Sequence, residues 1–358
     1  MRIRAERDDL SDVLARAARA VGTRSPQQIL QGLLCDVRGN RLEVTGTDSE
    51  ITIRTTLEVE VLEAGRTVVP AKLAAEAVRK LPVGAVTLSA EEGEVEITGN
   101  GPRFRLREFV VNDFPDIPDT IEAPLVEVEG EAFVAALTQV GVAASGDDAR
   151  PTLTGVLFET QGEGLRLVAT DSYRLALRDL PGIAPGATAL VPYRALREIG
   201  RTIADAKIGV QLDGRQAAFS SGRGRLTARL IEATFPNYHQ LLPDAYPNRL
   251  SVRKAALLEA VGRAALVAED HIPVRLSLSE GGVELSVTRQ EVGEETEHIE
   301  ADYSGEEMTI AFNTRYLTDG VSAVAGEEVV LETIDPLKPG MLSGGSDGFQ
   351  YLLMPVRL

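Results

Sequence analysis

Apolar residues follow the spacing of one helix face, i, i+3, i+4, i+7 and i+8, at three well-separated places in the chain. These runs begin at Leu10, Phe133 and Leu257. Between them the pattern changes to the alternation of apolar and polar residues that is typical of strands. The sequence therefore predicts three similar blocks, each of which begins with an amphipathic helix and continues in β-structure.

An internal duplication accounts for the first two blocks, and the third is a more diverged copy. Landmarks recur in one order at a spacing of 123 positions (170 − 47) that falls to 121 (235 − 114). A period of this length indicates repeated domains rather than short solenoid units. The paired landmarks are Gly32 and Gly155, Thr47-Asp48-Ser49 and Thr170-Asp171-Ser172, Val69-Pro70 and Val191-Pro192, and Phe114-Pro115 and Phe235-Pro236.

Each copy is predicted to contain two helices and several strands. The helices are expected over 8–20, 71–81, 130–143, 192–204, 253–266 and 313–324. In the first copy the strands are expected over 29–37, 41–57, 85–88, 95–97 and 104–106, with turns at 38–40 and 91–93. The predicted fold is α+β, with two helices on one face of an antiparallel sheet in each of three tandem domains. The expected domain boundaries are 1–120, 121–247 and 248–358.

Composition excludes several classes of protein. The 358 residues contain no apolar run of 18 or more, and the first residues lack the apolar core of a signal peptide. We therefore expect a soluble, cytoplasmic protein with no membrane partner. The single cysteine, Cys35, excludes an internal disulfide and a multi-cysteine zinc site, and its counterpart Phe158 indicates a core position. No metal site or cofactor is predicted.

Positive charge is concentrated on predicted helices, although the net charge is −17. Arg194, Arg197 and Arg201 fall at i, i+3 and i+7 on one helix stripe, and further cations occur on the predicted helices 8–20, 71–81 and 253–266. An ordinary solvated helix face explains any one of these residues. Together they indicate a surface that attracts phosphates without reading bases.

The repeated Thr-Asp-Ser offers a hydroxyl beside a carboxylate, but an enzyme would also need a base. The three histidines, His239, His271 and His298, occupy unrelated positions in the repeats. Thr and Asp at the end of a strand more often bond to local backbone, and we prefer that interpretation. No phosphate-binding loop with its lysine is present either. A hydrolase that uses Asp171 remains a weaker alternative.

Three segments carry a resemblance to a known family. They are residues 168–176, residues 235–238 with 241–243, and the terminal residues 351–358. With the threefold repeat, they resemble the bacterial DNA sliding clamp, the beta subunit of DNA polymerase III. The resemblance covers essentially the whole chain. It implies a non-catalytic processivity factor, a head-to-tail homodimer that forms a six-domain ring around duplex DNA, with the helices lining the hole. The alternative is a clamp-like paralogue that serves as a scaffold for a peptide or another ligand and has no replication role.

The resemblance also implies partners and site residues. The DNA polymerase III catalytic subunit, the clamp loader and other proteins would dock short peptides in one groove. Ser172-Tyr173 replaces the Gly-His pair of some family members, which would change ligand preference at the groove wall. The groove residues would be Leu153, Thr170, Tyr173, Arg174, Leu175, Pro236, Leu241, Leu353, Met354, Pro355, Val356 and Arg357.

Two further sets of residues are expected to contact double-stranded DNA and the second protomer. The basic strand that contains Arg103 and Arg105 and the acidic strand region that contains Glu297 and Glu300 would pair across the dimer and set its head-to-tail direction. The DNA-facing residues would be Arg24, Arg150, Lys72, Arg79, Arg194, Arg197 and Arg201. The dimer interface would contain Arg103, Phe104, Arg105, Leu106, Leu266, Val267, Glu297 and Glu300.

Overall fold

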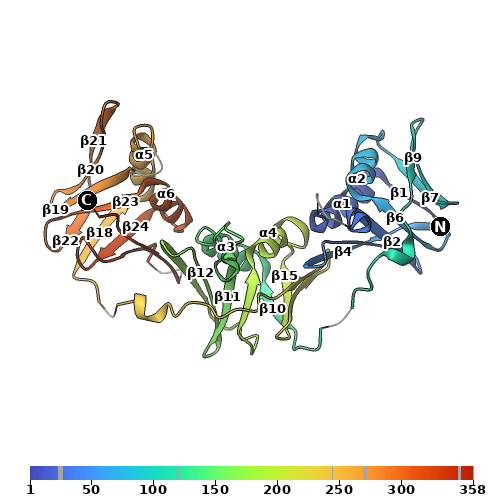
Figure 1. Ribbon diagram of the computed structural model, residues 1–358, viewed down its shortest axis with the longest axis horizontal. Coiled ribbons are helices and arrows are strands. Elements are labelled where there is room, and N and C mark those ends of the chain that lie inside the picture. The colour runs from blue at the N-terminus through green and yellow to red at the C-terminus, as the bar shows by residue number, and fades with distance from the viewer. Residues whose placement is uncertain (23–26, 119–120, 244, 269–271, 346–347, 358) are drawn as a thin grey trace. The chain divides into compact units, whose positions relative to one another are not determined.

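The computed structural model describes residues 1–22, 27–118, 121–243, 245–268, 272–345 and 348–357. Its elements are helices and antiparallel strands, which confirms the predicted α+β class (Figure 1). Within these ranges, the helices are too short or too polar to cross a membrane. The chain divides into two compact units, residues 1–134 with 194–230 and residues 135–193 with 231–358.

The six predicted helices are confirmed, with ends that differ by a few residues. Two of them begin with residues that are typical of helix starts. Asn313 caps α6 because its side-chain oxygen accepts a hydrogen bond from the Tyr316 amide at 3.0 Å. Pro70 directly precedes α2, which begins at Ala71 as predicted. The helices are α1 (Arg7–Ala17), α2 (Ala71–Lys80), α3 (Gly130–Gly141), α4 (Tyr193–Thr202), α5 (Lys254–Ala264) and α6 (Thr314–Ala323).

The first unit contains a five-stranded sheet in the order β5-β1-β7-β8-β9 and an eight-stranded sheet in the order β10-β15-β16-β17-β4-β3-β2-β6. Strands of the first and second repeats meet in the larger sheet, where β17 pairs with β4. The strands are β1 (Arg2–Glu6), β2 (Gly32–Arg38), β3 (Arg41–Thr47), β4 (Ile51–Glu58), β5 (Glu60–Glu63), β6 (Arg66–Pro70), β7 (Ala85–Glu91), β8 (Glu94–Thr98), β9 (Arg103–Arg107), β10 (Val126–Glu129), β15 (Lys207–Leu212), β16 (Gln216–Ser221) and β17 (Gly224–Arg229).

The second unit has the corresponding plan. A nine-stranded sheet runs in the order β14-β11-β12-β13-β26-β25-β24-β18-β22, and a four-stranded sheet runs β21-β20-β19-β23. Here β13 of the second repeat pairs with β26 of the third. The strands are β11 (Gly155–Gln161), β12 (Gly164–Thr170), β13 (Arg174–Leu180), β14 (Ala189–Pro192), β18 (Asn248–Arg253), β19 (Pro273–Ser279), β20 (Gly282–Arg289), β21 (Gly293–Ile299), β22 (Asp302–Ser304), β23 (Met308–Asn313), β24 (Glu328–Thr333), β25 (Gly340–Ser343) and β26 (Phe349–Leu353).

Two strand predictions were wrong in their limits. The predicted strand 29–37 begins only at Gly32, because residues Gln28–Gln31 form a short 3₁₀ helix. The predicted strand 41–57 is two strands, β3 and β4, because Ser49 adopts a φ of +77° and reverses the chain. The apolar alternation stops at Val44 and resumes at Ile51, so the turn lies in the polar stretch that the single predicted strand included.

The interior of the first repeat is apolar, and Cys35 belongs to it. Cys35 is fully buried among residues of α1, α2 and the surrounding strands, as predicted for a core position. Burial raises the pKa of its thiol to about 12, so the thiol stays protonated and unreactive at neutral pH.

Gly46 provides a test of this packing. A Cβ at Gly46 of β3 would lie 2.2 Å from the carbonyl oxygen of Ala17, which is backbone and cannot rotate away. We expect Gly46→Ala to lower the free energy of unfolding by about 2 kcal/mol or more. Gly262 in α5 faces open space, so Gly262→Ala should be neutral or stabilising by about 1 kcal/mol. Chemical denaturation of both variants checks this, and equal stabilities would contradict the close approach.

Candidate functional site

The repeated Thr-Asp-Ser forms the same hydrogen-bonded turn in both copies. In the second copy, the Thr170 hydroxyl donates to the Arg174 carbonyl at 2.7 Å, and Asp171 Oδ1 accepts from the Tyr173 and Arg174 amides at 2.9 and 3.1 Å. Ser172 has a φ of +84°, against +77° for Ser49 in the first copy. These bonds to local backbone match the preferred interpretation of the motif, and they set the direction in which β13 begins.

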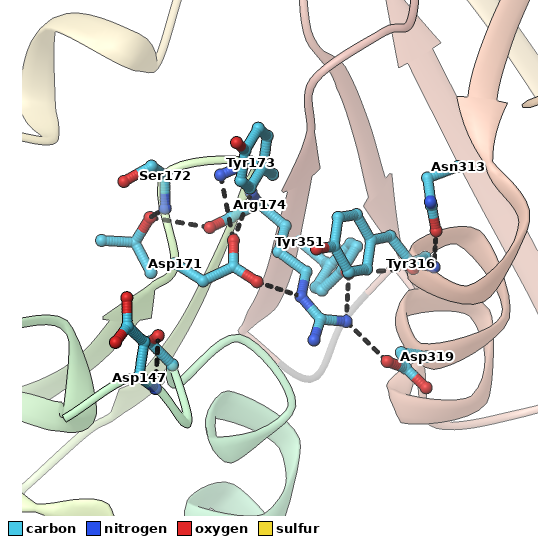
Figure 2. Close-up of polar contacts among 11 residues, drawn as sticks. Asp147, Asp171, Ser172, Tyr173, Arg174, Asn313, Tyr316, Asp319 and Tyr351 are labelled. Atoms are coloured by element: carbon cyan, nitrogen blue, oxygen red, sulfur yellow. Dashed lines mark hydrogen bonds and ion pairs between the residues drawn. The ribbon is translucent and has the colours of Figure 1, made fainter. Parts of the chain in front are cut away.

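Arg174 is held by a buried polar network at the start of β13 (Figure 2). Its Nε donates to Asp171 Oδ2 at 2.9 Å, and its NH1 donates to Asp319 Oδ2 at 2.6 Å and to the Tyr351 hydroxyl at 3.3 Å. Burial alone would lower the pKa of Arg174, but the interactions with Tyr351, Asp319 and Asp171 outweigh it and raise the pKa. The guanidinium is therefore a permanent charge whose donors are directed at fixed acceptors.

Aromatic rings extend this network to the surface. The Arg174 guanidinium carbon lies 4.3 Å from the centre of the Tyr316 ring, a cation–π contact. Tyr173 stacks on Tyr316 with ring centres 6.2 Å apart, and 58% of Tyr173 is exposed. Sequence reasoning found Tyr173 and Arg174 but missed Tyr316 and Asp319. Asp319 occupies the place in α6 that Glu198 occupies in α4, five residues after the first helical residue, and that shared position was the available signal.

The C-terminal segment runs beside this turn. Leu353 of β26 lies opposite Arg174 of β13, and the Met354 amide donates to the Tyr173 carbonyl at 3.0 Å. The Val356 amide then donates to the Ala311 carbonyl at 2.8 Å. Met354 keeps 40% of its surface exposed. The end of the last strand therefore keeps part of its apolar surface accessible.

The segment between β17 and β18 packs on the same sheet. Tyr238 is buried in a cluster with Leu175, Leu352 and Met341, and its hydroxyl donates to Glu159 at 2.5 Å. Burial and the bond to Glu159 together raise the pKa of Tyr238. This anchor leaves Leu241, three residues further on, 44% exposed.

The structure therefore brings together part of the predicted groove. Backbone pairing and hydrogen bonds link the turn at 170–175 with Leu353 and Met354, while Leu175 joins the apolar cluster below. Leu153 is buried on the 3₁₀ helix Pro151–Thr154. The remaining predicted groove residues lie on the two segments described above: Pro236, Leu241, Pro355, Val356 and Arg357.

The predicted DNA-facing residues are exposed where they are described. Arg194, Arg197 and Arg201 point away from the buried side of α4, where Leu196 and Ile199 lie. Arg194 donates to Asp48 at 2.6 Å, and Arg197 and Arg201 lie within 4 Å of Glu198. Lys72 and Arg79 are exposed on α2, Arg150 pairs with Asp147 at 2.9 Å, and Arg24 lies outside the described residues.

Arg16 does not belong to that surface. Although helical spacing puts it beside Arg19, it is buried and donates to the carbonyl of Thr202 at 3.1 Å and to that of Arg223 at 2.6 Å. Burial outweighs the nearby Asp12 and lowers the pKa of Arg16. Its role is to join the first and second repeats, which periodicity alone does not reveal.

The predicted dimer residues lie on sheet edges and on the end of a helix. Arg103, Phe104, Arg105 and Leu106 belong to β9, the last strand of the five-stranded sheet. Glu297 belongs to β21, which ends the four-stranded sheet, and Glu300 follows it. Arg263 binds both oxygens of Glu297 at 2.8 and 2.6 Å, and Leu266, just beyond α5, is 84% exposed. Val267 follows it and is half-buried.

The described residues offer few groups for metal binding or for acid–base catalysis. No group of three or more His, Cys, Asp or Glu side chains there is arranged to hold a metal ion. His239 lies near Glu159 at 3.7 Å, and both oxygens of Asp171 are engaged by backbone amides or by Arg174.

Comparison with known proteins places this architecture. Models of the N-terminal, central and C-terminal domains of the DNA polymerase III beta subunit match residues 1–118, 127–237 and 239–357. The beta sliding clamp of Streptomyces coelicolor is 34% identical, with 100% of each chain covered. The chain belongs to the beta sliding clamp family. The beta sliding clamp homolog GriR of Streptomyces muensis is also similar, at 30% identity over 100% of this chain and 99% of that protein.

Solved clamps share the fold. The Pseudomonas aeruginosa DnaN sliding clamp bound to griselimycin is 27% identical with a TM-score of 0.95, and 100% of each chain is covered. The Bacillus subtilis DNA polymerase sliding clamp is 25% identical with a TM-score of 0.95, over 100% of this chain and 99% of that one. The predicted family and its repeated clamp fold are therefore confirmed.

The Arg174 network of this clamp can be tested through Asp319. We expect Asp319→Ala to lower the free energy of unfolding by about 1–3 kcal/mol, because the buried guanidinium loses one of two carboxylate partners. The exposed pair of Glu259 with Arg263 serves as a control, and Glu259→Ala should cost less than about 0.5 kcal/mol. Chemical denaturation measures both, and similar losses would argue against the network.

Proposed function

We propose that this clamp is a processivity factor. Two copies close head to tail into a ring around duplex DNA, slide on it, and tether a polymerase and other DNA-processing proteins through bound peptides. The observation that carries this proposal is the way in which successive repeats join. Each join inside the chain extends one sheet into the next, and one edge of each kind remains for a second copy.

The two joins within the chain follow one rule. The strand that ends the sheet of one repeat pairs with the strand after the Thr-Asp-Ser turn of the preceding repeat: β17 with β4, and β26 with β13. In the first repeat the strand equivalent to β17 and β26 is β9. In the third repeat the strand equivalent to β4 and β13 is β21. Within the described residues both are sheet edges, which makes them natural mates across two copies.

Repeat equivalence also gives the register of that third join. Leu226 lies opposite Ile53, and Tyr351 lies opposite Ala176. The position of Leu226 and Tyr351 is taken by Phe104 in β9, since each pairs in the same way with the neighbouring strand. The position of Ile53 and Ala176 is taken by Glu295 in β21. We therefore propose that Phe104 lies opposite Glu295 of the second copy.

This register places complementary charges together. Arg105 then lies opposite Glu294 of the second copy, and Arg103 lies opposite Thr296. In the single chain, Arg103 and Arg105 share Glu96 at 3.5 and 3.2 Å, so each has a neighbour to exchange on association. Head-to-tail pairing of a basic edge with an acidic edge closes after two copies and leaves neither edge exposed.

The basic helix surface supports DNA sliding. Exposed cations on α2 and α4 that do not read bases would give sequence-independent attraction to the backbone. Each phosphate contact steepens the log–log salt dependence by about 0.9, so a few contacts attract the duplex without fixing it. The ring provides retention, and the acidic remainder of the protein disfavours binding elsewhere.

The exposed apolar residues beside Arg174 support peptide docking. Tyr173, Leu241 and Met354 each expose at least 40% of their surface next to a rigid, hydrogen-bonded turn. Two or three ligand side chains that cover them would contribute about 1.5–3 kcal/mol each before ordering costs, which gives exchangeable binding. Griselimycin bound to the P. aeruginosa clamp supports a ligand of this kind. The polymerase III catalytic subunit and the clamp loader are the partners we propose.

The rest of the proposal concerns catalysis, location and domains. We infer that the protein has no turnover activity, since the carboxylate of Asp171 is committed to structure. A replication clamp works where the chromosome lies, so we assign it to the cytoplasm. The domains we propose remain 1–120, 121–247 and 248–358.

Charge exchange tests ring closure and its register. We expect Arg105→Glu to shift the protein from dimer toward monomer and to abolish its retention on nicked circular DNA after loading. Adding Glu294→Arg should restore both at least partly, because the proposed pair is re-formed with reversed signs. Sizing with light scattering and a gel-filtration retention assay measure these effects.

A scaffold without a replication role predicts the opposite result for DNA. If the wild-type dimer leaves circular and linear DNA equally fast after loading, topological retention is wrong. The matched control for Arg105→Glu is Arg107→Glu. Arg107 lies on the same edge strand but outside the proposed Arg105 pair, so this variant should retain more of the dimer.

Peptide docking is tested with griselimycin as the probe. We expect Tyr173→Ala and Met354→Ala each to weaken its binding about tenfold or more, because each removes exposed apolar area next to Arg174. Leu337 is also largely exposed but lies between β24 and β25, so Leu337→Ala should leave binding unchanged. Isothermal titration calorimetry measures all three, and an equal loss in the control would contradict the assigned site.

A further inference from the structure

A cavity of about 610 Å³ lies between α1 and α2 of the first repeat. One wall is formed by Ser11 and Ala15 of α1 and by Ala18 just after it, and the α2 wall by residues spaced i, i+3, i+4 and i+7, so the cavity follows the groove between the two helices. Phe109 and Pro70 close one side. The volume lies within the range of small-molecule sites. This cavity is separate from the residues proposed to dock peptides.

The second repeat explains why the cavity exists. There Tyr193, the first residue of α4, covers Gly141 so closely that a Cβ on Gly141 would lie 2.0 Å from the ring carbon Cζ. The strand pairs Gly32–Pro70 and Gly155–Pro192 show that Ala71 is the counterpart of Tyr193. The counterpart of Gly141 is Ala18, eight residues after the first apolar residue of its helix. Both alanines line the cavity. The first repeat thus lacks the aromatic ring that fills this place in the second.

The walls of the cavity are chemically uneven. Apolar side chains and the ring of Phe109 form the sides, while among the described lining residues Arg19, Lys72 and Arg79 supply three cations against the carboxylate of Glu76. Arg19 is paired with Glu198 of α4. Lys72 and Arg79 are exposed and lie on one face of α2, seven residues apart. Neither has an ion pair among the described residues. A mainly apolar cavity with two cations at its rim fits a planar ring that carries a negative group.

We propose that this cavity binds a small planar aromatic anion. The aromatic ring of the ligand occupies the space in the first repeat that is equivalent to the one Tyr193 fills in the second. It packs against Phe109, Ala18 and Ala71. The anionic group lies between Lys72 and Arg79. Two sources share this chemistry, a nucleoside monophosphate and an aryl phosphate or carboxylate without a sugar. The site shares Lys72 and Arg79 with the proposed DNA-facing surface, but it lies within the first repeat and requires neither ring closure nor peptide docking.

Rebuilding the second repeat's pair tests the ring slot. Deoxyadenosine monophosphate and 1-naphthyl phosphate are titrated separately into the full-length protein, with saturation-transfer difference NMR and calorimetry as readouts. We expect saturable binding of at least one of them, with a dissociation constant on the order of 100 µM. The double variant A18G/A71Y should weaken that binding at least tenfold, because its own tyrosine fills the slot. Its melting temperature should equal or exceed that of the wild type, which separates filling from misfolding.

Charge variants test the rim independently of folding. Lys72→Ala and Arg79→Ala should each weaken binding about threefold to tenfold and reduce its salt dependence. Lys80 is exposed on the same helix and does not line the cavity, so Lys80→Ala is the matched control and should bind like the wild type. Binding of only one probe supports the proposal and identifies the source.

Any of the following outcomes would overturn the proposal. One is that neither probe binds at millimolar concentration. Another is that inorganic phosphate alone competes as well as the aromatic probes, which would remove the need for a ring. The last is that Lys80→Ala loses as much affinity as Lys72→Ala, or that A18G/A71Y binds as tightly as the wild type.

Discussion

Backbone hydrogen bonding between the edge strands of successive repeats is the constraint on which the rest of this molecule depends. An unpaired strand edge leaves a row of polar groups that other strands can bind, and this chain covers four such edges by joining β17 to β4 and β26 to β13. The second join also builds the candidate site. Because β26 pairs with β13, the C-terminal residues come to lie beside Tyr173, and the Met354 amide reaches the Tyr173 carbonyl. The apolar surface proposed for peptides is thus a consequence of how two repeats are connected.

The Thr-Asp-Ser turn links this backbone architecture to side-chain chemistry. In the first copy, Asp48 caps its own turn with Oδ1 and binds Arg194 of α4 with Oδ2. In the second copy, Asp171 caps its turn in the same way, but its other oxygen binds Arg174 of the same turn. One motif therefore ties a strand to a neighbouring helix in one place and fixes a buried cation in the other. The local bonds are identical, and the distant partner decides the outcome.

Sequence patterns predicted what depends on neighbours along the chain and missed what depends on distant ones. The six helices and the duplication follow from the spacing of apolar residues and from landmarks such as Phe114-Pro115. The break after β3 was not predicted, because the polar stretch that contains Ser49 was included in one long strand although the apolar alternation stops there. Arg16 has a partner 186 positions away, and Asp319 reaches Arg174 across 145 positions, so no local pattern reveals either contact. The predicted groove residues came from family resemblance rather than from such contacts. Their role in binding peptides stays a prediction.

Divergence at equivalent positions explains how one repeated frame serves different purposes. At the start of the strand after the turn, the first repeat has Ile51, the second has Arg174 and the third has Gly293. Ile51 is buried opposite Ala228, so this join is apolar and closed. Arg174 needs carboxylate and aromatic partners, and the cluster that satisfies it also holds the surface next to Tyr173 in place. Gly293 carries no side chain and begins an edge strand rich in glutamate. In the proposed dimer this edge would pair without a buried anchor, through charges that salt can screen, which suits a contact that opens and closes, whereas Ile51 and Arg174 are buried in the two internal joins.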